Sequence, residues 1–150
     1  MYHDILVPVD GSATAERGLR EAVQLAAEHK AKVHLLHVID DFPLLLGMAT
    51  PFRFEEDLLR EARAAGEQLL ERGRAAAARA GVQADTALRS VMRRRVADVV
   101  VDEATKSGID LIVMGTHGRR GFSRLGLGSD AEGVARASTV PVLLVHGDRP

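Results

Sequence analysis

Residues 110–137, with the sequence DLIVMGTHGRRGFSRLGLGSDAEGVARA, decide the fold of this chain. Asp110 opens the stretch and is followed by the continuous apolar run Leu111–Met114. Such a run is typical of a parallel strand that is buried on both faces. A glycine-rich loop and a pattern typical of a helix follow it. The stretch therefore predicts a strand, a loop and a helix in direct succession.

The glycines of this loop have the spacing Gly115-x2-Gly118-x9-Gly128-Ser129. Backbone without side chains can approach a bulky ligand from two sides. Ser129 with Glu132 three residues later has the form of a capping box, which predicts a helix starting at Ser129. The N–H groups and the dipole of a helix start favour an anion, and a phosphate is the anion we expect. Taken alone, a Gly-Ser pair is also a common loop glycine and helix cap.

Length and composition limit the classes of protein to consider. The chain has 150 residues, a formal net charge of −1 and no cysteine. This length predicts one domain, and the charge balance gives no reason to expect a nucleic acid or membrane partner. The lack of cysteine excludes disulfides and thiolate metal sites, and fits a reducing compartment. With no signal segment or apolar run of membrane-spanning length, we expect a cytoplasmic protein.

Strand and helix patterns alternate along the whole chain. Residues 4–39 read as a strand, a helix that ends near Lys30 and a second strand, with Pro8 loosening the first strand. The broken but apolar segment 40–53 predicts either a lid over the sheet or a wall of a ligand crevice or partner surface. The remaining elements are predicted at 54–80 (helix ended by Gly81), 82–91 (edge strand), 96–106 (helix), 110–114 (strand), 129–137 (helix) and 140–145 (strand). This alternation predicts an α/β fold with an open, doubly wound, mostly parallel sheet.

Four segments along the chain, one of which overlaps the glycine loop, extend this pattern. They are DILVPVDGS at 4–12, HLLHVID at 34–40, DLIVMGTHG at 110–118 and TVPVLLVHG at 139–147. Together with the loop spacing, they resemble the universal stress protein family in its ATP-binding branch. The resemblance implies a Rossmann-like, flavodoxin-like five-stranded parallel sheet of order 3-2-1-4-5 with helices on both faces, as in the adenine nucleotide alpha hydrolases. It also implies an adenine nucleotide ligand, ATP above all, and a homodimer that pairs through the last strand.

The resemblance also implies roles for individual positions. Adenine would lie against Val38 and near Pro8, with Asp10 at the nucleoside end. Met114 and Gly115 would border the ribose. From the residues alone, Asp10 can equally be a plain helix-entry residue in its DGS turn. Three positions are implied to hold the phosphates: Gly118, Gly128 and Ser129.

Asp130 departs from the family pattern, in which a small or apolar residue often follows the Gly-Ser pair. A like charge at about 4 Å costs roughly 1 kcal/mol in water and about 4 kcal/mol at an effective dielectric of 20. A helix start supplies only roughly 0.3 to 2 kcal/mol toward an anion. Asp130 can be a first-turn acid that favours the helix dipole, or Mg²⁺ can bridge it to the phosphates. Arg119, with Arg120 and Arg124, can instead offset its charge.

Other chemical motifs are absent or weak. The chain has no G-x-x-x-x-G-K-[ST], G-x-S-x-G or H-E-x-x-H motif, and Gly126-x-Gly128-x-x-Ala131 comes too late for a dinucleotide fold. His34 and His37 lie on opposite sides of a strand and cannot chelate one metal. His117 can contact a phosphate or serve hydrogen bonding within the loop. The arginines at 93–95 lack interleaved aromatic residues, so they are poor evidence for nucleic acid.

Three functions stay open on the sequence. The first is a regulatory or stress-response module that binds ATP or a related adenine nucleotide. The second is a slow ATP hydrolase, although no residue is a convincing general base. The third is a nucleotide-free dimer that uses the apolar segment 42–48 as a partner surface. We assign no catalytic residue.

Overall fold

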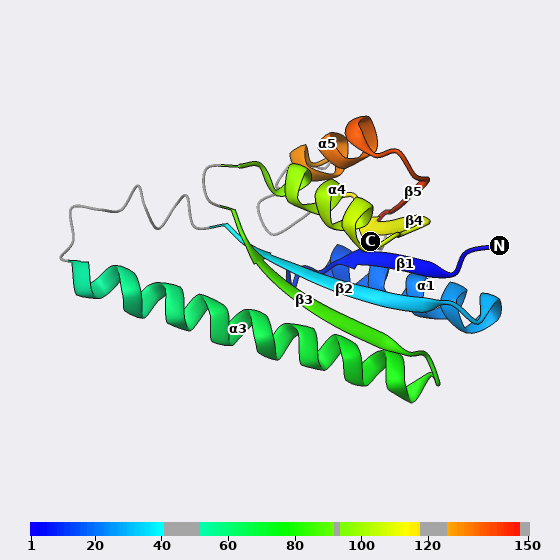
Figure 1. The fold of residues 1–150 in the computed structure, drawn as a ribbon, viewed down its shortest axis with the longest axis horizontal. Helices are drawn as coiled ribbons and strands as arrows, with labels where there is room; N and C mark the ends of the chain where they lie inside the picture. The colour runs from blue at the N-terminus through cyan, green and yellow to red at the C-terminus, as the bar shows by residue number, and fades with distance from the viewer. Residues whose placement is uncertain (41–51, 92–93, 118–125, 148–150) are drawn as a thin grey trace.

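The fold is a five-stranded parallel sheet of order β3-β2-β1-β4-β5, as predicted (Figure 1). The computed structural model describes residues 1–40, 52–91, 94–117 and 126–147, without the side chains of 52–55. The strands are β1 (Asp4–Pro8), β2 (Lys32–Ile39), β3 (Ala84–Ser90), β4 (Leu111–Gly115) and β5 (Val142–Val145). The helices are α1 (Ala13–His29), α3 (Phe52–Arg79), α4 (Val96–Lys106) and α5 (Ser129–Ala137). None of these helices is both long enough and apolar enough to pass through a bilayer.

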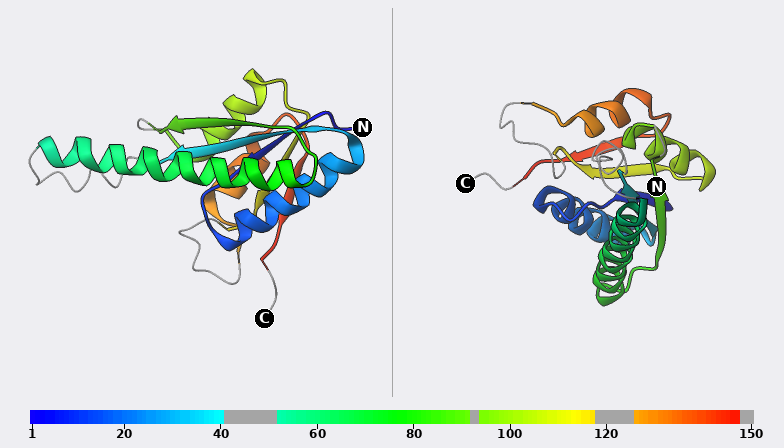
Figure 2. Two further views of the ribbon diagram at one scale, coloured as in Figure 1. Left: turned by 90° about the horizontal axis from the view of Figure 1, so that it is seen from below. Right: turned by 90° about the vertical axis from the view of Figure 1, so that its left-hand side faces the viewer.

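Helices cover both faces of the sheet, with α1 and α3 on one face and α4 and α5 on the other (Figures 1 and 2). Because side chains alternate along a strand, β1 supplies both cores. Ile5 and Val7 pack with α1 and α3, whereas Leu6 packs with α4 and α5. The whole of β4 is buried, as its apolar run predicts. The central strands are thus fixed by helices on both faces. Because the strands are parallel, their carboxyl ends all lie at the same end of the sheet.

Helix ends follow local chemistry. Ser12 caps α1 by accepting a hydrogen bond from the N–H of Ala15 at 3.2 Å. Lys30 ends α1 in the left-handed region at φ 56°, close to the predicted end. Gly81 follows α3 at φ 73° and Gly108 follows α4 at φ 64°, which glycine adopts without a steric cost.

The start of α5 is where predicted, but the capping box is wrong. The N-cap is Gly128, and no side chain caps the helix. Ser129 is therefore the first helical residue, one position too late to act as the cap. The carboxylate of Glu132 accepts from Arg136 at 2.7 Å on the helix surface. Since the N-cap carries no side chain, the first turn of α5 depends on backbone contacts for its position.

Helix α3 has nearly the predicted bounds, but its start is more exposed than its apolar pattern predicts, and strand β5 starts later than predicted. Helix α3 has 28 residues, about 42 Å at the usual rise, and its first turns extend past the sheet (Figure 1). Leu58, near the start of this helix, is consequently 38% exposed. Strand β5 starts at Val142 and not at Val140, because Pro141 lacks an N–H and the N–H of Val140 donates to the Ser138 hydroxyl at 3.1 Å.

Candidate functional site

A crevice of about 1410 Å³ surrounds the carboxyl ends of β1, β2 and β4. Ligand pockets usually hold roughly 300 to 1,000 Å³, so one small ligand would fill only part of it. The crevice lies where the strand order reverses, which is the usual ligand site of such sheets. Gly118 and Arg119 lie outside the described residues. The other predicted site residues all line the crevice: Pro8, Asp10, Val38, Met114, Gly115, Gly128, Ser129 and Asp130.

Asp10 shapes the turn that leads from β1 into α1. Its Oδ1 accepts a hydrogen bond from the N–H of Ser12 at 2.9 Å. Gly11 between them has φ 80°, which favours glycine at this turn. The helix-entry role that the sequence allowed for Asp10 is therefore present. Asp10 nevertheless lines the crevice, so its role in the turn does not exclude contact with a ligand.

Gly115 is required by packing against α1. A Cβ at Gly115 would lie 2.8 Å from the carbonyl carbon of Thr14 and 3.0 Å from the nitrogen of Ala15. Side chains could move aside, but these atoms belong to the backbone of the first turn of α1. The bare backbone at Gly115 thus allows a strand end and a helix start to meet. The glycine spacing of the sequence instead predicted that Gly115 leaves room for a ligand.

Gly128 closes the loop onto its own beginning. Its N–H donates to the carbonyl of Thr116 at 2.8 Å, and a Cβ there would lie 2.9 Å from the same oxygen. This amide is therefore engaged within the protein. The first bond of the helix ladder runs from the N–H of Glu132 to the carbonyl of Gly128 at 2.9 Å. The N–H groups of 129–131 accordingly have no partner inside α5, as in any first helical turn.

Thr116 and His117 anchor the start of the loop. Thr116 is 1% exposed, and its N–H donates to the carbonyl of Val145 at 2.9 Å. The Thr116 hydroxyl lies 3.0 Å from Nδ1 of His117, whose Nε2 contacts the carbonyl of Gly126. Because a carbonyl only accepts, Nε2 carries the hydrogen. The Thr14 hydroxyl donates to the carbonyl of His117. Both ring nitrogens and the carbonyl of His117 are therefore engaged in contacts that hold the loop.

Sequence reasoning missed the contribution of α3 to the crevice. Ala62, Ala65, Gly66 and Leu69 line it at the spacing of one helix face. A Cβ at Gly66 would lie 2.6 Å from Cδ2 of His37, whose Nδ1 donates to the carbonyl of Val9 at 2.7 Å. A glycine inside a helix lowers helix stability by about 1 kcal/mol relative to alanine. A glycine at position 66 was therefore the sequence signal that another element approaches α3 closely there. We call these four α3 residues the apolar wall.

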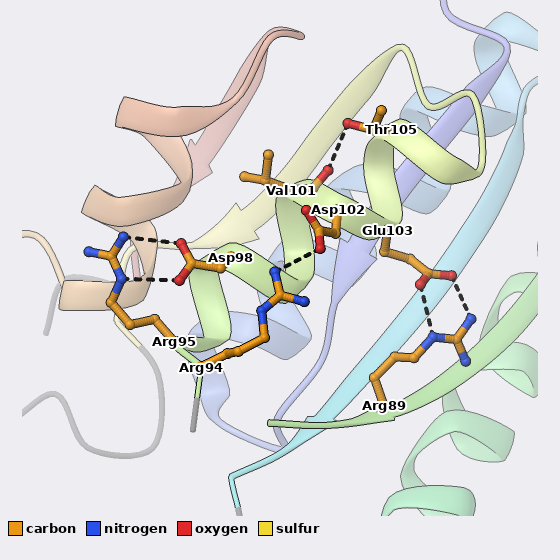
Figure 3. A network of polar contacts seen from close by, with 8 residues as sticks. All are labelled: Arg89, Arg94, Arg95, Asp98, Val101, Asp102, Glu103 and Thr105. Carbon is orange, nitrogen blue, oxygen red and sulfur yellow. Dashed lines mark hydrogen bonds and ion pairs between the residues drawn. The ribbon is translucent and has the colours of Figure 1, made fainter. Parts of the chain in front are cut away.

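The opposite side of the crevice is polar and charged. Arg94 and Arg95 line it just before α4, close to the first turn of α5. Arg94 donates to Asp102 at 2.7 Å, and Arg95 donates to Asp98 at 3.1 and 3.2 Å (Figure 3). The hydrogen bonds from Arg95 hold the pKa of the Asp98 carboxyl below its usual range. Their sequence pattern alone gave no indication that these arginines line a crevice. We call the starts of α4 and α5, residues 94–97 and 128–133, the polar wall.

Known proteins resemble this chain along nearly its whole length. A sequence model of the Universal stress protein family matches residues 1–146. The chain belongs to the universal stress protein family. Universal stress protein YxiE of Bacillus subtilis is 33% identical, with 97% of this chain and 100% of the relative covered. The solved structure of MJ0577 from Methanocaldococcus jannaschii has a TM-score of 0.86 at 28% identity and covers 100% of this chain and 99% of its own.

The structure of a second universal stress protein was solved with a bound nucleotide. The protein from Archaeoglobus fulgidus, solved in complex with dAMP, has a TM-score of 0.66 at 25% identity. The match covers 96% of this chain and 98% of that one. A universal stress protein with this fold therefore binds an adenine nucleotide. The roles of individual residues in the present chain stay predictions.

Proposed function

We propose that this universal stress protein binds ATP or a related adenine nucleotide in the crevice, as the regulatory ligand of a stress-response module. The observation that carries the proposal is the polar wall. There the first turn of α5, with N–H groups at 129–131 outside the helix ladder, borders a large crevice at the strand ends. Such a turn favours phosphate through its amides and its dipole. The dAMP complex of the Archaeoglobus fulgidus relative supports adenosine as the remainder of the ligand.

The two walls suit the two halves of a nucleotide. We place adenine between Val38 and the apolar wall, near Pro8, with Asp10 toward the nucleoside. Met114 and Gly115 border the ribose in this placement. The phosphates lie at Ser129 and its neighbours in the first turn of α5, together with Gly118 and Arg119 of the loop. Gly128 contributes by closing the loop, since its own amide is engaged.

Magnesium is the second proposed component. Among the described residues, no three His, Asp or Glu side chains gather closely enough to hold a metal ion by themselves. Mg²⁺ usually binds through one or two carboxylates together with substrate phosphates, and Asp130 beside the proposed phosphate position fits that habit. The ion would neutralise the charge that Asp130 places there. We expect magnesium chelation to weaken ATP binding, and an affinity that chelation leaves unchanged would refute the bridge.

The rival hydrolase function has less support, whereas segment 42–48, the predicted partner surface of a nucleotide-free dimer, lies outside the described residues. A hydrolase needs a general base, but His117 is engaged at both ring nitrogens and Asp10 holds the turn before α1. A dimer remains part of our proposal as the assembly of the nucleotide-binding protein. Strand β5 lies at the sheet edge with Leu143 39% exposed, and unpaired edges favour pairing with a second chain. The predicted cytoplasmic location stays a prediction.

The function is tested on the purified chain. Mass spectrometry should detect a co-purifying adenine nucleotide, and ATP should raise the melting temperature of nucleotide-stripped protein. At a ligand concentration 100 times the dissociation constant, binding stabilises by about 2.7 kcal/mol. The control nucleotide is CTP, which carries the same triphosphate with a different base. An empty protein whose melting temperature does not respond to millimolar ATP would contradict the proposal.

A further inference from the structure

The starts of α4 and α5 meet at the crevice. A Cβ at Gly133 of α5 would lie 2.7 Å from the Cβ of Ala97 in α4, so the two helices touch at this point. Arg95 precedes Ala97 by two residues, and Ser129 precedes Gly133 by four. At about 1.5 Å of rise per residue, both helix starts lie within roughly one turn of the contact. A side chain as long as arginine can therefore reach from the start of α4 toward the first turn of α5.

Arg95 is the side chain placed to do this. It is the N-cap residue of α4, and its side chain makes no capping bond. Its only described partner is Asp98, one turn into α4, and its side chain is 78% exposed. Arg94 differs, because it reaches two turns down the helix to Asp102 and is 49% exposed (Figure 3). Arg95 can thus change partner without unpacking anything, whereas Arg94 is directed away from α5.

We propose that Arg95 is a phosphate-binding residue of the crevice, and that Asp98 holds its guanidinium while no phosphate is bound. This inference rests on the proposed nucleotide function and adds a residue that selects phosphorylated ligands over the bare nucleoside. Arginine binds phosphate through two parallel charge-assisted hydrogen bonds, as it binds a carboxylate. Exposed carboxylate pairs contribute little to stability, so exchanging Asp98 for a phosphate costs little.

We expect substitutions of Arg95 to lower the affinity for phosphorylated ligands and for no others. Replacing Arg95→Gln should weaken ATP binding about tenfold and leave adenosine binding unchanged, because only the phosphate partner is removed. Arg95→Lys should recover only part of the ATP affinity, since lysine cannot make the bidentate contact. Asp98→Asn should tighten ATP binding about twofold to threefold, because the competing carboxylate loses its charge.

The experiment is calorimetric titration of the full chain with adenosine, AMP and ATP at constant magnesium and salt. The matched control is Arg74→Gln. Arg74 donates to Glu71 at 2.7 and 3.0 Å, with the same three-residue spacing and charge as Arg95 with Asp98, but it does not line the crevice. We expect the control to bind all three ligands as the unchanged chain does.

The titrations distinguish a failure of the role of Arg95 from a failure of nucleotide binding itself. An unchanged chain that binds none of the three ligands would overturn both. If ATP binds, but Arg95→Gln loses no more affinity than Arg74→Gln, the function survives and the role of Arg95 is refuted. An equal loss for adenosine and ATP also refutes it, because the phosphates would then not be involved. ATP binding that is unchanged or weaker in Asp98→Asn would refute the holding role of Asp98.

Discussion

The two walls of the crevice are built in different ways. The apolar wall is one face of the long helix α3, where small side chains and Gly66 allow close approach to His37. The polar wall is two helix starts, held together where Gly133 meets Ala97 and carrying arginines that are already paired. The four residues of the apolar wall thus offer contact area without charge, with Arg72 of α3 lining the crevice farther along, and the polar wall offers amides and cations. This crevice is therefore suited to a ligand with an apolar end and an anionic end.

The largest expected effect concerns the strand end between the walls. Gly115→Ala places a methyl group against the backbone of Thr14 and Ala15, which cannot move without shifting α1. We expect a destabilisation of about 3 kcal/mol, at the upper end of the usual range for overpacking. Urea unfolding measures it. The control is Gly81→Ala, which has open space but a left-handed φ and should cost only about 1 kcal/mol. Equal costs would contradict the packing role of Gly115.

The next effect tests how the polar wall is fixed to the sheet. Arg89 on β3 donates to Glu103 on α4 at 2.9 Å through two nitrogens, and the Glu103 side chain is only 11% exposed (Figure 3). Arg89→Met should destabilise by about 2 kcal/mol, because it leaves a buried carboxylate without its partner. Arg94→Met removes a half-exposed partner and should cost under about 1 kcal/mol. A smaller cost for Arg89→Met than for Arg94→Met in urea unfolding would refute the anchoring role.

A smaller effect separates the walls by ligand. Ala65→Leu fills part of the apolar wall and should weaken adenosine and ATP by the same factor, about tenfold or 1.4 kcal/mol. The polar-wall variant Arg95→Gln should instead affect only the phosphorylated ligand. Ala64→Leu, on the neighbouring exposed position outside the crevice, is the control. If Ala65→Leu weakens ATP but not adenosine in a calorimetric titration, the assignment of the two walls is wrong.

The smallest effect is a pH dependence on the polar wall. Because Arg95 lowers the pKa of Asp98, this pair stabilises the fold above the ordinary carboxyl pKa and loses that contribution as the pH falls through the lowered value. Asp98→Asn should therefore lower the melting temperature slightly at pH 7 and not at pH 2. Glu71→Gln should behave alike, since Arg74 lowers the pKa of Glu71 in the same way. A difference between unchanged and variant chains that is as large at pH 2 as at pH 7 would contradict the pairing.

The fold was predictable because its signals are local. Continuous apolar runs marked the buried strands, Gly81 marked a helix end, and the alternation of strands and helices selected the parallel sheet. The capping box at Ser129 was wrong although the start of α5 was right, and the predicted start of the last strand was wrong because Pro141 shortens β5. The strand order itself came from the family resemblance.

The site was predictable only in part, because spacing does not show what a residue touches. The glycine spacing located the crevice, yet Gly115 meets the backbone of α1 and the amide of Gly128 meets Thr116. The apolar wall and Arg95 belong to elements distant in sequence from the loop, so no local pattern assigned them to it. Only tertiary packing brings Ala65 and Ser129 to one crevice.

The central claim is that the first turn of α5 binds the phosphates of an adenine nucleotide. The most direct measurement is a crystal structure of this chain grown with Mg²⁺ and excess ATP. We predict phosphate oxygens within hydrogen-bonding distance of the N–H groups of Ser129 and Ala131, with adenine beside Val38. An empty crevice, or a triphosphate bound away from that turn, would contradict the account.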